Sequence, residues 1–213
     1  MATAPPTGHA IPWGRMLRSR SVWALCLMYG FGGFAANFFV TLLPTYLSDY
    51  RHLDKDQIKW LSSLPLACGI VGCLLGGVVS DLIVRTTGNR RWGRVLTGVV
   101  GASCAGVAVV STVWVEDVTL LAVLLCTTFF CNDLAMGPAW AAVADIGERH
   151  AGTLGGKMNM VGNVGGAVAM LITGYLFKAG RPELVFAVYA CSFGLASLCW
   201  LFVDVTRPVS AEP

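Results

Sequence analysis

The sequence predicts an all-α polytopic membrane protein whose six transmembrane helices form one bundle, and three observations support this prediction. Of the 213 residues, 55% are hydrophobic and only 13% are charged, whereas soluble domains carry about 25% charged residues. The mean hydropathy is positive, at +0.67. Six long apolar stretches also follow one another, each near the roughly 20 residues that a helix needs to cross a bilayer.

The spans and their flanking segments follow from these stretches in order. The first stretch is too long for the apolar core of a signal peptide, so we expect it to be a retained helix. Residues 1–21 are predicted to form a cytoplasmic N-terminal segment, residues 22–203 the six-helix bundle, and residues 204–213 a cytoplasmic tail. The predicted spans are Val22–Leu47, Leu61–Val84, Val95–Val115, Val118–Ala144, Met158–Phe177 and Leu184–Val203.

Several features inside the spans are typical of membrane helices. Pro44 in the first span and Pro138 in the fourth predict local breaks or kinks. A row of small residues in the second span predicts close approach by a neighbouring helix: Gly69, Gly72 and Gly76. Tryptophans stand near the ends of the spans, as an interfacial belt requires: Trp23, Trp60, Trp92 and Trp114.

Lysine and arginine are unevenly divided between the two sides of the predicted bundle. Ten lie on the side of the turn between the second and third spans, and five lie on the other side. Because positively charged loops stay in the cytoplasm, we predict an inner-membrane or plasma-membrane protein with both termini cytoplasmic. The ten residues are Arg15, Arg18, Arg20, Arg85, Arg90, Arg91, Arg94, Arg149, Lys157 and Arg207.

The polar residues give no indication of an enzyme or of a bound metal. All eight cysteines lie in apolar stretches and none forms a C-x-x-C pair, so we expect reduced packing residues. Neither H-E-x-x-H nor G-x-S-x-G occurs, and these are the motifs of zinc peptidases and serine hydrolases. A net charge of +3 is too small to indicate nucleic-acid binding. We therefore expect no catalytic residues and no cofactor.

The turn between the second and third spans is the most informative motif of the chain. It reads Gly77-Val-Val-Ser-Asp81-Leu-Ile-Val-Arg85-Thr-Thr-Gly88-Asn-Arg90-Arg91. Asp81 and Arg85 are four residues apart and so share a helix face. An aspartate here can accept hydrogen bonds from the N-terminus of another helix, and a contact that forms in only one conformation acts as a gate. The spacing alone fits an ordinary positive-inside loop equally well.

Together with three further stretches, this turn resembles the loop signature of the major facilitator superfamily, and the chain is similar to its anion:cation symporter family. The resemblance covers residues 22–208. It implies the C-terminal six-helix half of a secondary active transporter for organic anions, such as sugar acids, coupled to protons or sodium. The three stretches are Val22-Trp-Ala-Leu-Cys-Leu-Met-Tyr29 with Thr41-Leu-Leu-Pro44-Thr-Tyr46-Leu; Phe129-Phe-Cys-Asn132-Asp133-Leu-Ala-Met-Gly137-Pro138-Ala-Trp140; and Ala151-Gly-Thr153 with Met158-Asn159-Met-Val-Gly162-Asn163-Val-Gly165-Gly166.

The resemblance also implies partners: a small organic anion, a coupling cation, the lipid bilayer and an N-terminal six-helix half. That other half usually carries the charged residues that bind the cation. Leu82 replaces the usual basic residue after the motif aspartate, so we expect Arg85 to supply that contact or the contact to be absent. No lysine or arginine lies in the middle of a predicted span, so this half lacks a positive partner for an anion at the midplane. An uncompensated charge there costs at least about 2.5 kcal/mol.

Two groups of side chains are the candidate site residues. The expected substrate-binding residues are Tyr29, Asn37, Asn132, Asp133, Trp140, Asn159 and Asn163. The expected residues of a cytoplasmic gate are Gly77, Asp81, Arg85, Gly88, Arg90, Arg91 and Asp145.

Most of these residues keep a structural interpretation beside the functional one. Asn159 and Asn163 can bind hydroxyls of a sugar-like substrate or hold helices together. The aromatic residues of the set can stack on a substrate or simply pack. Asp133 is a functional candidate because it lies deep in a span; it can titrate, orient Asn132 or form a structural hydrogen bond. Asp145 fits a gate network with Arg85 or Arg94, or a surface ion pair.

The chain as a whole also keeps two interpretations. In the first, it works with an N-terminal half, and the two bundles rock about a site near the midplane. The alternative is a non-transporting membrane protein, either a regulatory partner or a truncated remnant. A neighbouring reading frame that encodes six further helices with an intramembrane arginine would distinguish them.

Overall fold

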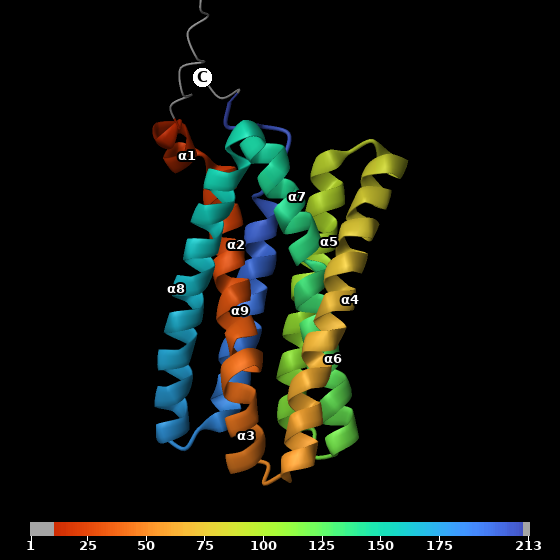
Figure 1. Cartoon of the computed structure of the whole chain (residues 1–213), viewed down its shortest axis with the longest axis vertical. Helices are drawn as coiled ribbons and strands as arrows, with labels where there is room; N and C mark the ends of the chain where they lie inside the picture. Colours follow the sequence, from red (N-terminus) through yellow and green to blue (C-terminus); the bar gives the residue numbers. More distant parts are fainter. Residues whose placement is uncertain (1–10, 211–213) are drawn as a thin grey trace, which may run out of the picture.

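A computed structural model describes residues 11–210, and Figure 1 shows them as long helices that run along one axis and are joined alternately at its two ends. The predicted all-α fold is confirmed. The elements in order are α1 (Trp13–Arg18), α2 (Arg20–Asn37), the π-helix η1 (Phe38–Leu42), α3 (Leu43–Asp49), α4 (Lys55–Thr87), α5 (Arg90–Ser111), the 3-10 helix η2 (Thr112–Trp114), α6 (Val118–Leu134), α7 (Met136–Gly147), the 3-10 helix η3 (Glu148–His150), α8 (Ala151–Lys178) and α9 (Pro182–Leu201).

These helices make six passes along the axis within residues 11–210. Five stretches are long and apolar enough to span a membrane, and the longest of them, Val118–Lys178, has 61 residues. That stretch holds two passes, because the chain reverses between α7 and α8 (Figure 1), where Glu148 has a φ of 45°. The passes are the α2–α3 rod, α4, α5, the α6–α7 rod, α8 and α9, and each corresponds to one predicted span.

Two of the passes are interrupted just before a proline, as the sequence predicted. The α2–α3 rod contains the π-helix η1 two residues before Pro44, and the α6–α7 rod breaks at Ala135, three residues before Pro138. Proline has no backbone N–H for the carbonyl four residues earlier, so the carbonyls of Val40 and Leu134 lose their usual helical partners. Both interruptions lie in helices that line the cavity described below.

Side chains at the helix ends account for where several passes begin and stop. Asp54 and Gln57 form a capping box at the start of α4, and the side chains of Asn89 and Asp117 cap α5 and α6. Such caps satisfy backbone N–H groups that have no partner within the helix. Gly88 ends α4 in the left-handed conformation, with a φ of 69°, which glycine adopts without steric cost.

The predicted row of small residues is where α4 and α6 pack backbone to backbone. A Cβ at Gly72 would collide with the carbonyl of Phe130, and one at Gly76 would collide with the carbonyl of Leu134. The pair α2 and α8 is equally close, since a Cβ at Gly33 would lie 2.9 Å from the carbonyl oxygen of Gly162. The prediction of close helix approach at these glycines is therefore confirmed.

Two hydrophobic clusters fill the bundle, one in each half of its length. The first also takes up side chains from outside the predicted spans, because Met16 of α1 and Val205 and Val209 of the tail are buried in it. The N–H of Val209 donates to the carbonyl of Ile146 at 2.9 Å, which ties the tail to α7. Residues 1–10 of the predicted N-terminal segment and 211–213 of the tail lie outside the described residues.

The outer surface of the bundle is apolar and its basic loops gather at one end. Ile70, Leu74 and Val78 of α4 are each at least 64% exposed, as expected of side chains that face lipid. Figure 1 places α1, the α4–α5 turn, the α7–α8 turn and the tail at the same end. We call this the arginine-rich end, because it carries the ten basic residues counted above.

The α4–α6 contact gives a direct test of the packing. The double substitution Gly72→Ala/Gly76→Ala should destabilise the bundle by about 1–3 kcal/mol, because two backbone carbonyls must move to admit the new methyl groups. Thermal unfolding in detergent micelles, followed by tryptophan fluorescence, measures this loss. Gly194→Ala is the matched control, since nothing lies within 4 Å of its Cβ position; an equal melting temperature for both variants would contradict the proposed packing.

Candidate functional site

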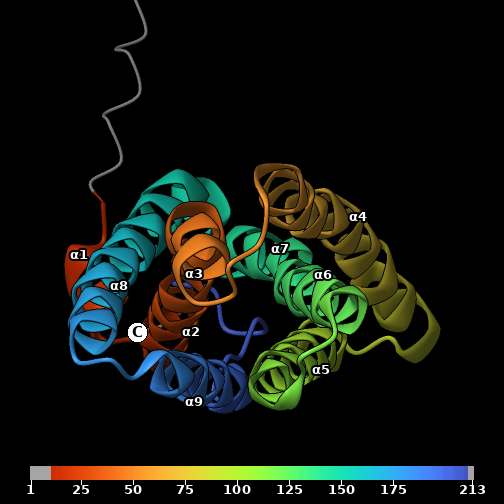
Figure 2. The ribbon, with the colours of Figure 1, turned by 90° about the horizontal axis from the view of Figure 1, so that it is seen from below.

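A cavity of about 460 Å³ lies between α2, α4, α6, α7 and α8, and all seven predicted substrate-binding residues line it. Figure 2 shows that α5 and α9 lie on the other side of the bundle, and neither contributes to the lining. The seven are Tyr29, Asn37, Asn132, Asp133, Trp140, Asn159 and Asn163, and the other lining residues are Gly32, Gly33, Ala36, Val40, Cys73, Met136, Gly162 and Gly166.

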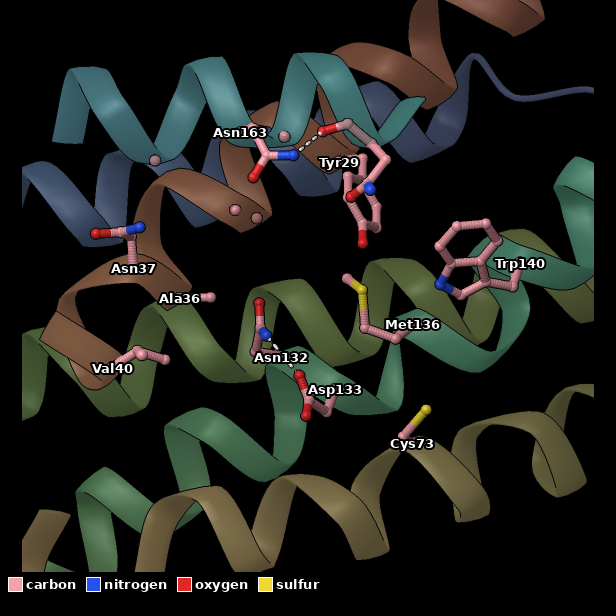
Figure 3. Close-up of a pocket in the computed structure, with 15 residues that line it drawn as sticks. Tyr29, Ala36, Asn37, Val40, Cys73, Asn132, Asp133, Met136, Trp140 and Asn163 are labelled. Atoms are coloured by element: carbon pink, nitrogen blue, oxygen red, sulfur yellow. Dashed lines mark hydrogen bonds between the residues drawn. The ribbon is translucent and has the colours of Figure 1, made fainter. Parts of the chain in front are cut away.

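The broken helices bring polar side chains to the cavity from two sides. Figure 3 shows Tyr29 and Asn163 on one side, facing Asn132 and Asp133 on α6, with Met136 of α7 beside Asn132. Asn132 and Asp133 come just before the break at Ala135. The side chains of the α6–α7 rod therefore enter the cavity next to an irregular piece of backbone, which is tolerated at membrane depth where it lines a cavity.

None of the four asparagines that line the cavity has an amide group bonded to another helix among residues 11–210. Asn163 Nδ2 donates to the carbonyl of Asn159 on its own helix at 3.0 Å. Oδ1 of Asn37 is buried and accepts no hydrogen bond within the described chain. A buried polar atom without a partner costs free energy, so the Asn37 amide does not stabilise a helix–helix contact through this oxygen.

Asp133 is held by its neighbour rather than by a distant helix. Asn132 Nδ2 donates to Asp133 Oδ1 at 2.8 Å, so the two side chains orient each other at the cavity wall. Asp133 also lies against Gly69 of α4, where a Cβ would come within 2.5 Å of Oδ2. Its second carboxylate oxygen is therefore confined between α4 and α6.

The two predicted aromatic residues lie together at the cavity. The rings of Tyr29 and Trp140 meet edge to face, with centroids 6.1 Å apart and an interplanar angle of 79°. Gly162 and Gly155 leave room for them, since a Cβ at either position would lie 3.0 Å or less from one of these rings. Trp140 is nevertheless 47% exposed, which leaves ring surface for a ligand to contact.

No lysine or arginine is among the residues that line the cavity. The nearest basic candidate in sequence is Lys157 of α8, two residues before Asn159. Its Nζ lies 4.1 Å from the ring centroid of Trp23, a cation–π contact with a residue that does not line the cavity. The cavity therefore offers amides, a hydroxyl, aromatic rings and one carboxyl group, but no positive charge.

The predicted gate residues lie at the arginine-rich end, and Arg94 connects two of them. Its Nη1 donates to Asp81 at 2.5 Å and to Ser80 at 2.8 Å, while Nε donates to Asp145 at 3.3 Å. One guanidinium thus bridges α4, α5 and α7. The side chains of Arg94 and Asp145 are only 11% and 19% exposed, so this contact is better shielded than an ordinary surface ion pair, whereas Asp81 is more exposed.

We expected a basic contact at Asp81 to come from Arg85 or to be absent, and neither is the case, because Arg94 is the basic partner of Asp81. Arg85 takes part in none of the ion pairs among residues 11–210. The reason is the tight turn at Gly88, which returns α5 antiparallel to α4 and places Arg94 beside Asp81. A Cβ at Gly93 would meet Val84 and the carbonyl of Ser80, so this glycine lets the two helices approach. Because α4 and α5 run antiparallel on either side of Gly88, residues at similar distances from it along the chain, such as Asp81 and Arg94, lie side by side.

The other predicted gate residues have separate positions around the same turn. Gly88 ends α4, and Arg90 is the first residue of α5. Arg91 Nη2 donates to the carbonyl of Leu201 at 3.3 Å, so it contacts α9 rather than the Arg94 network. Gly77 faces α7, where a Cβ on Gly137 would lie 2.5 Å from its backbone nitrogen.

Comparison with known proteins assigns this architecture. The family description that matches residues 2–170 is the Major Facilitator Superfamily. The chain belongs to this superfamily. It is thus an integral membrane protein, and the predicted resemblance is confirmed at this level.

Several curated relatives carry the names of organic-anion transporters. The chain is 33% identical over 196 residues to a probable sulfoacetate transporter of Cupriavidus necator, covering 92% of this chain and 45% of the relative. It is 31% identical over 177 residues to a probable galactarate/D-glucarate transporter of Escherichia coli K12, covering 80% and 39%. A hexuronate transporter of Bacillus subtilis is 27% identical over 218 residues, covering 97% and 49%. The chain spans about half the length of these relatives.

The Arg94 contacts predict a stability effect that distinguishes it from Arg85. Arg94→Gln should lower the free energy of unfolding by about 1–3 kcal/mol, mainly because the shielded carboxylate of Asp145 and the hydroxyl of Ser80 lose a charged hydrogen-bond partner. Arg85→Gln removes the same charge from the same turn and should change the free energy by less than about 0.5 kcal/mol. Thermal unfolding in detergent measures both, and an equal effect of the two variants would remove Arg94 from the network.

Proposed function

We propose that this chain is the C-terminal half of a secondary active transporter for small organic anions such as sugar acids. The observation that carries the proposal is the cavity of about 460 Å³, lined by four asparagines, Tyr29 and Trp140. Amides and a phenol hydroxyl can donate and accept hydrogen bonds, which matches a ligand with many hydroxyl groups. The printed names of the relatives, which include sulfoacetate, glucarate and hexuronate transporters, support the anionic class.

The proposal includes an N-terminal six-helix half that supplies what this cavity lacks. An anion near the midplane needs a positive partner, and the lining residues of this chain include no lysine or arginine. The other half would provide that charge and the main site for the coupling cation, which is a proton or sodium. Two bundles that rock about such a site are the usual arrangement of alternating access.

In this proposal, the Arg94 network is the part of the gate that this chain contributes. Asp81 is 56% exposed in its side chain although it binds Arg94, so an oxygen stays accessible to an approaching helix end. The arginine-rich end faces the cytoplasm, as positive loops do. Asp81 would then contact the other half when the transporter closes on that side.

Uptake into proteoliposomes tests the proposal directly. We expect uptake of radiolabelled glucarate, hexuronate or sulfoacetate when this chain is co-reconstituted with an N-terminal half of a relative, and none with either half alone. Imposing a proton gradient and a sodium gradient separately identifies the coupling ion. Absence of uptake for all three anions, with both halves inserted and associated, would overturn the proposal.

A substitution in the cavity tests the role of the asparagines. In the reconstituted pair, Asn163→Ala should raise the apparent KM for the anion by roughly tenfold through loss of a hydrogen bond, while membrane insertion stays normal. Val164→Ala is the matched control, because Val164 is the next residue of α8 but does not line the cavity. Unchanged uptake kinetics in the Asn163 variant would exclude this residue from the site.

A further inference from the structure

A second cavity, of about 340 Å³, lies at the arginine-rich end on the side of the bundle away from the transport cavity. It forms where the start of α2, the start of α5 and the end of α9 meet. Four arginines line it, together with one carboxylate and two apolar residues. None of its lining residues lines the first cavity or takes part in the Arg94 contacts. Arg91 is the one predicted gate residue among them.

The charges around this cavity do not balance. Its four arginines are Arg18, Arg20, Arg91 and Arg207, and its one acid is Asp204. Asp204 Oδ2 lies 3.5 Å from Arg207 Nε. The ion pairs among residues 11–210 include none that engages the other three arginines.

Asp204 does not attract a cation to this place, because its oxygens are already bound. Burial acts to raise its pKa, but hydrogen bonds from the hydroxyl and the N–H of Thr206, with Arg91 and Arg207 nearby, outweigh burial and lower the pKa. The carboxylate is therefore ionised at neutral pH and directed toward Thr206. The cavity keeps a surplus of positive charge.

Two of the four arginines, Arg91 and Arg20, are held in place by neighbouring groups other than acids. Arg91 Nη2 donates to the last carbonyl of α9, that of Leu201, at 3.3 Å. The Cζ atom of Arg20 lies 5.9 Å from the ring centroid of Phe202. Arg91 uses one N–H group for this contact, and Arg20 uses the face of its guanidinium. The other N–H groups of both side chains can therefore bind an anion with several oxygens, such as a phosphate.

An apolar surface continues from this cavity along the helix that forms its floor. Leu195 and Leu198 of α9 and Phe202, which directly follows it, occur at helical spacing and are 45%, 56% and 57% exposed. A ligand that fits both parts has a compact anionic group and long hydrocarbon chains. Basic pockets between transmembrane helices at the membrane surface bind the headgroups of anionic lipids in this way.

We propose that this cavity binds the phosphate headgroup of an anionic phospholipid, with the acyl chains along α9. Arg18, Arg20 and Arg91 contact the phosphate, and Phe202 separates it from the hydrocarbon region. This proposal does not depend on the proposed transport activity, because the two cavities have no lining residue in common.

Lipid retention tests this site on the full chain. The purified chain is placed in nanodiscs made of phosphatidylcholine with a small fraction of fluorescent phosphatidylglycerol, and energy transfer from its tryptophans reports binding. Each arginine near an anionic surface contributes roughly fivefold in affinity, so Arg18→Gln/Arg20→Gln should weaken binding about 30-fold. The conservative pair Arg18→Lys/Arg20→Lys should retain most of it.

Matched controls make the result decisive. Arg85→Gln/Arg149→Gln removes the same charge from the same end, outside the cavity, and should retain binding. Competition with inorganic phosphate tests the alternative source of the anion, and we expect it to displace no lipid. Equal loss in the control pair, full binding in the Arg18/Arg20 glutamine pair with an unchanged melting temperature, or displacement by inorganic phosphate would each overturn the proposal.

Discussion

Direct contact between helix backbones is the constraint on which the bundle depends. The hydrophobic effect does not drive apolar helices together within lipid, so their association needs close van der Waals packing. Here α4 meets α6 at Gly72 and Gly76, and α2 meets α8 at Gly33 and Gly162. Residues of both helix pairs line the cavity of about 460 Å³, so the cavity lies between two closely packed pairs of helices.

Prolines then shape the space that the glycines define. Pro44 and Pro138 interrupt the two rods on which Asn37, Asn132 and Asp133 lie, so polar side chains occur beside irregular backbone. The carbonyl of Leu134, which Pro138 cannot bond, is also the one that fits against Gly76 of α4. The helix break at Ala135 and the close contact between α4 and α6 therefore occur at the same place in the fold.

Much of this could be predicted from the sequence, and the failures have a common cause. Spans, breaks and the seven cavity residues follow from local patterns of hydropathy, proline and polar residues inside apolar stretches. Arg94 was expected only as one of two possible partners of Asp145, and its contact with Asp81 was not predicted. That contact depends on the register of α4 and α5, which the turn at Gly88 sets. Gly32, Gly33, Ala36 and Met136 were missed as lining residues for another reason, since they carry no chemistry that distinguishes them from packing residues.

The anchored tail has a practical consequence for handling the protein. Val209 is fully buried and its N–H is bonded to the end of α7, while Arg15 of α1 donates to the carbonyl of Ser210 at 3.2 Å. Residues 205–210 thus cover the end of the first hydrophobic cluster. Trimming them to aid crystallisation would open that cluster to solvent, and an affinity tag is better joined through a spacer than in place of these residues.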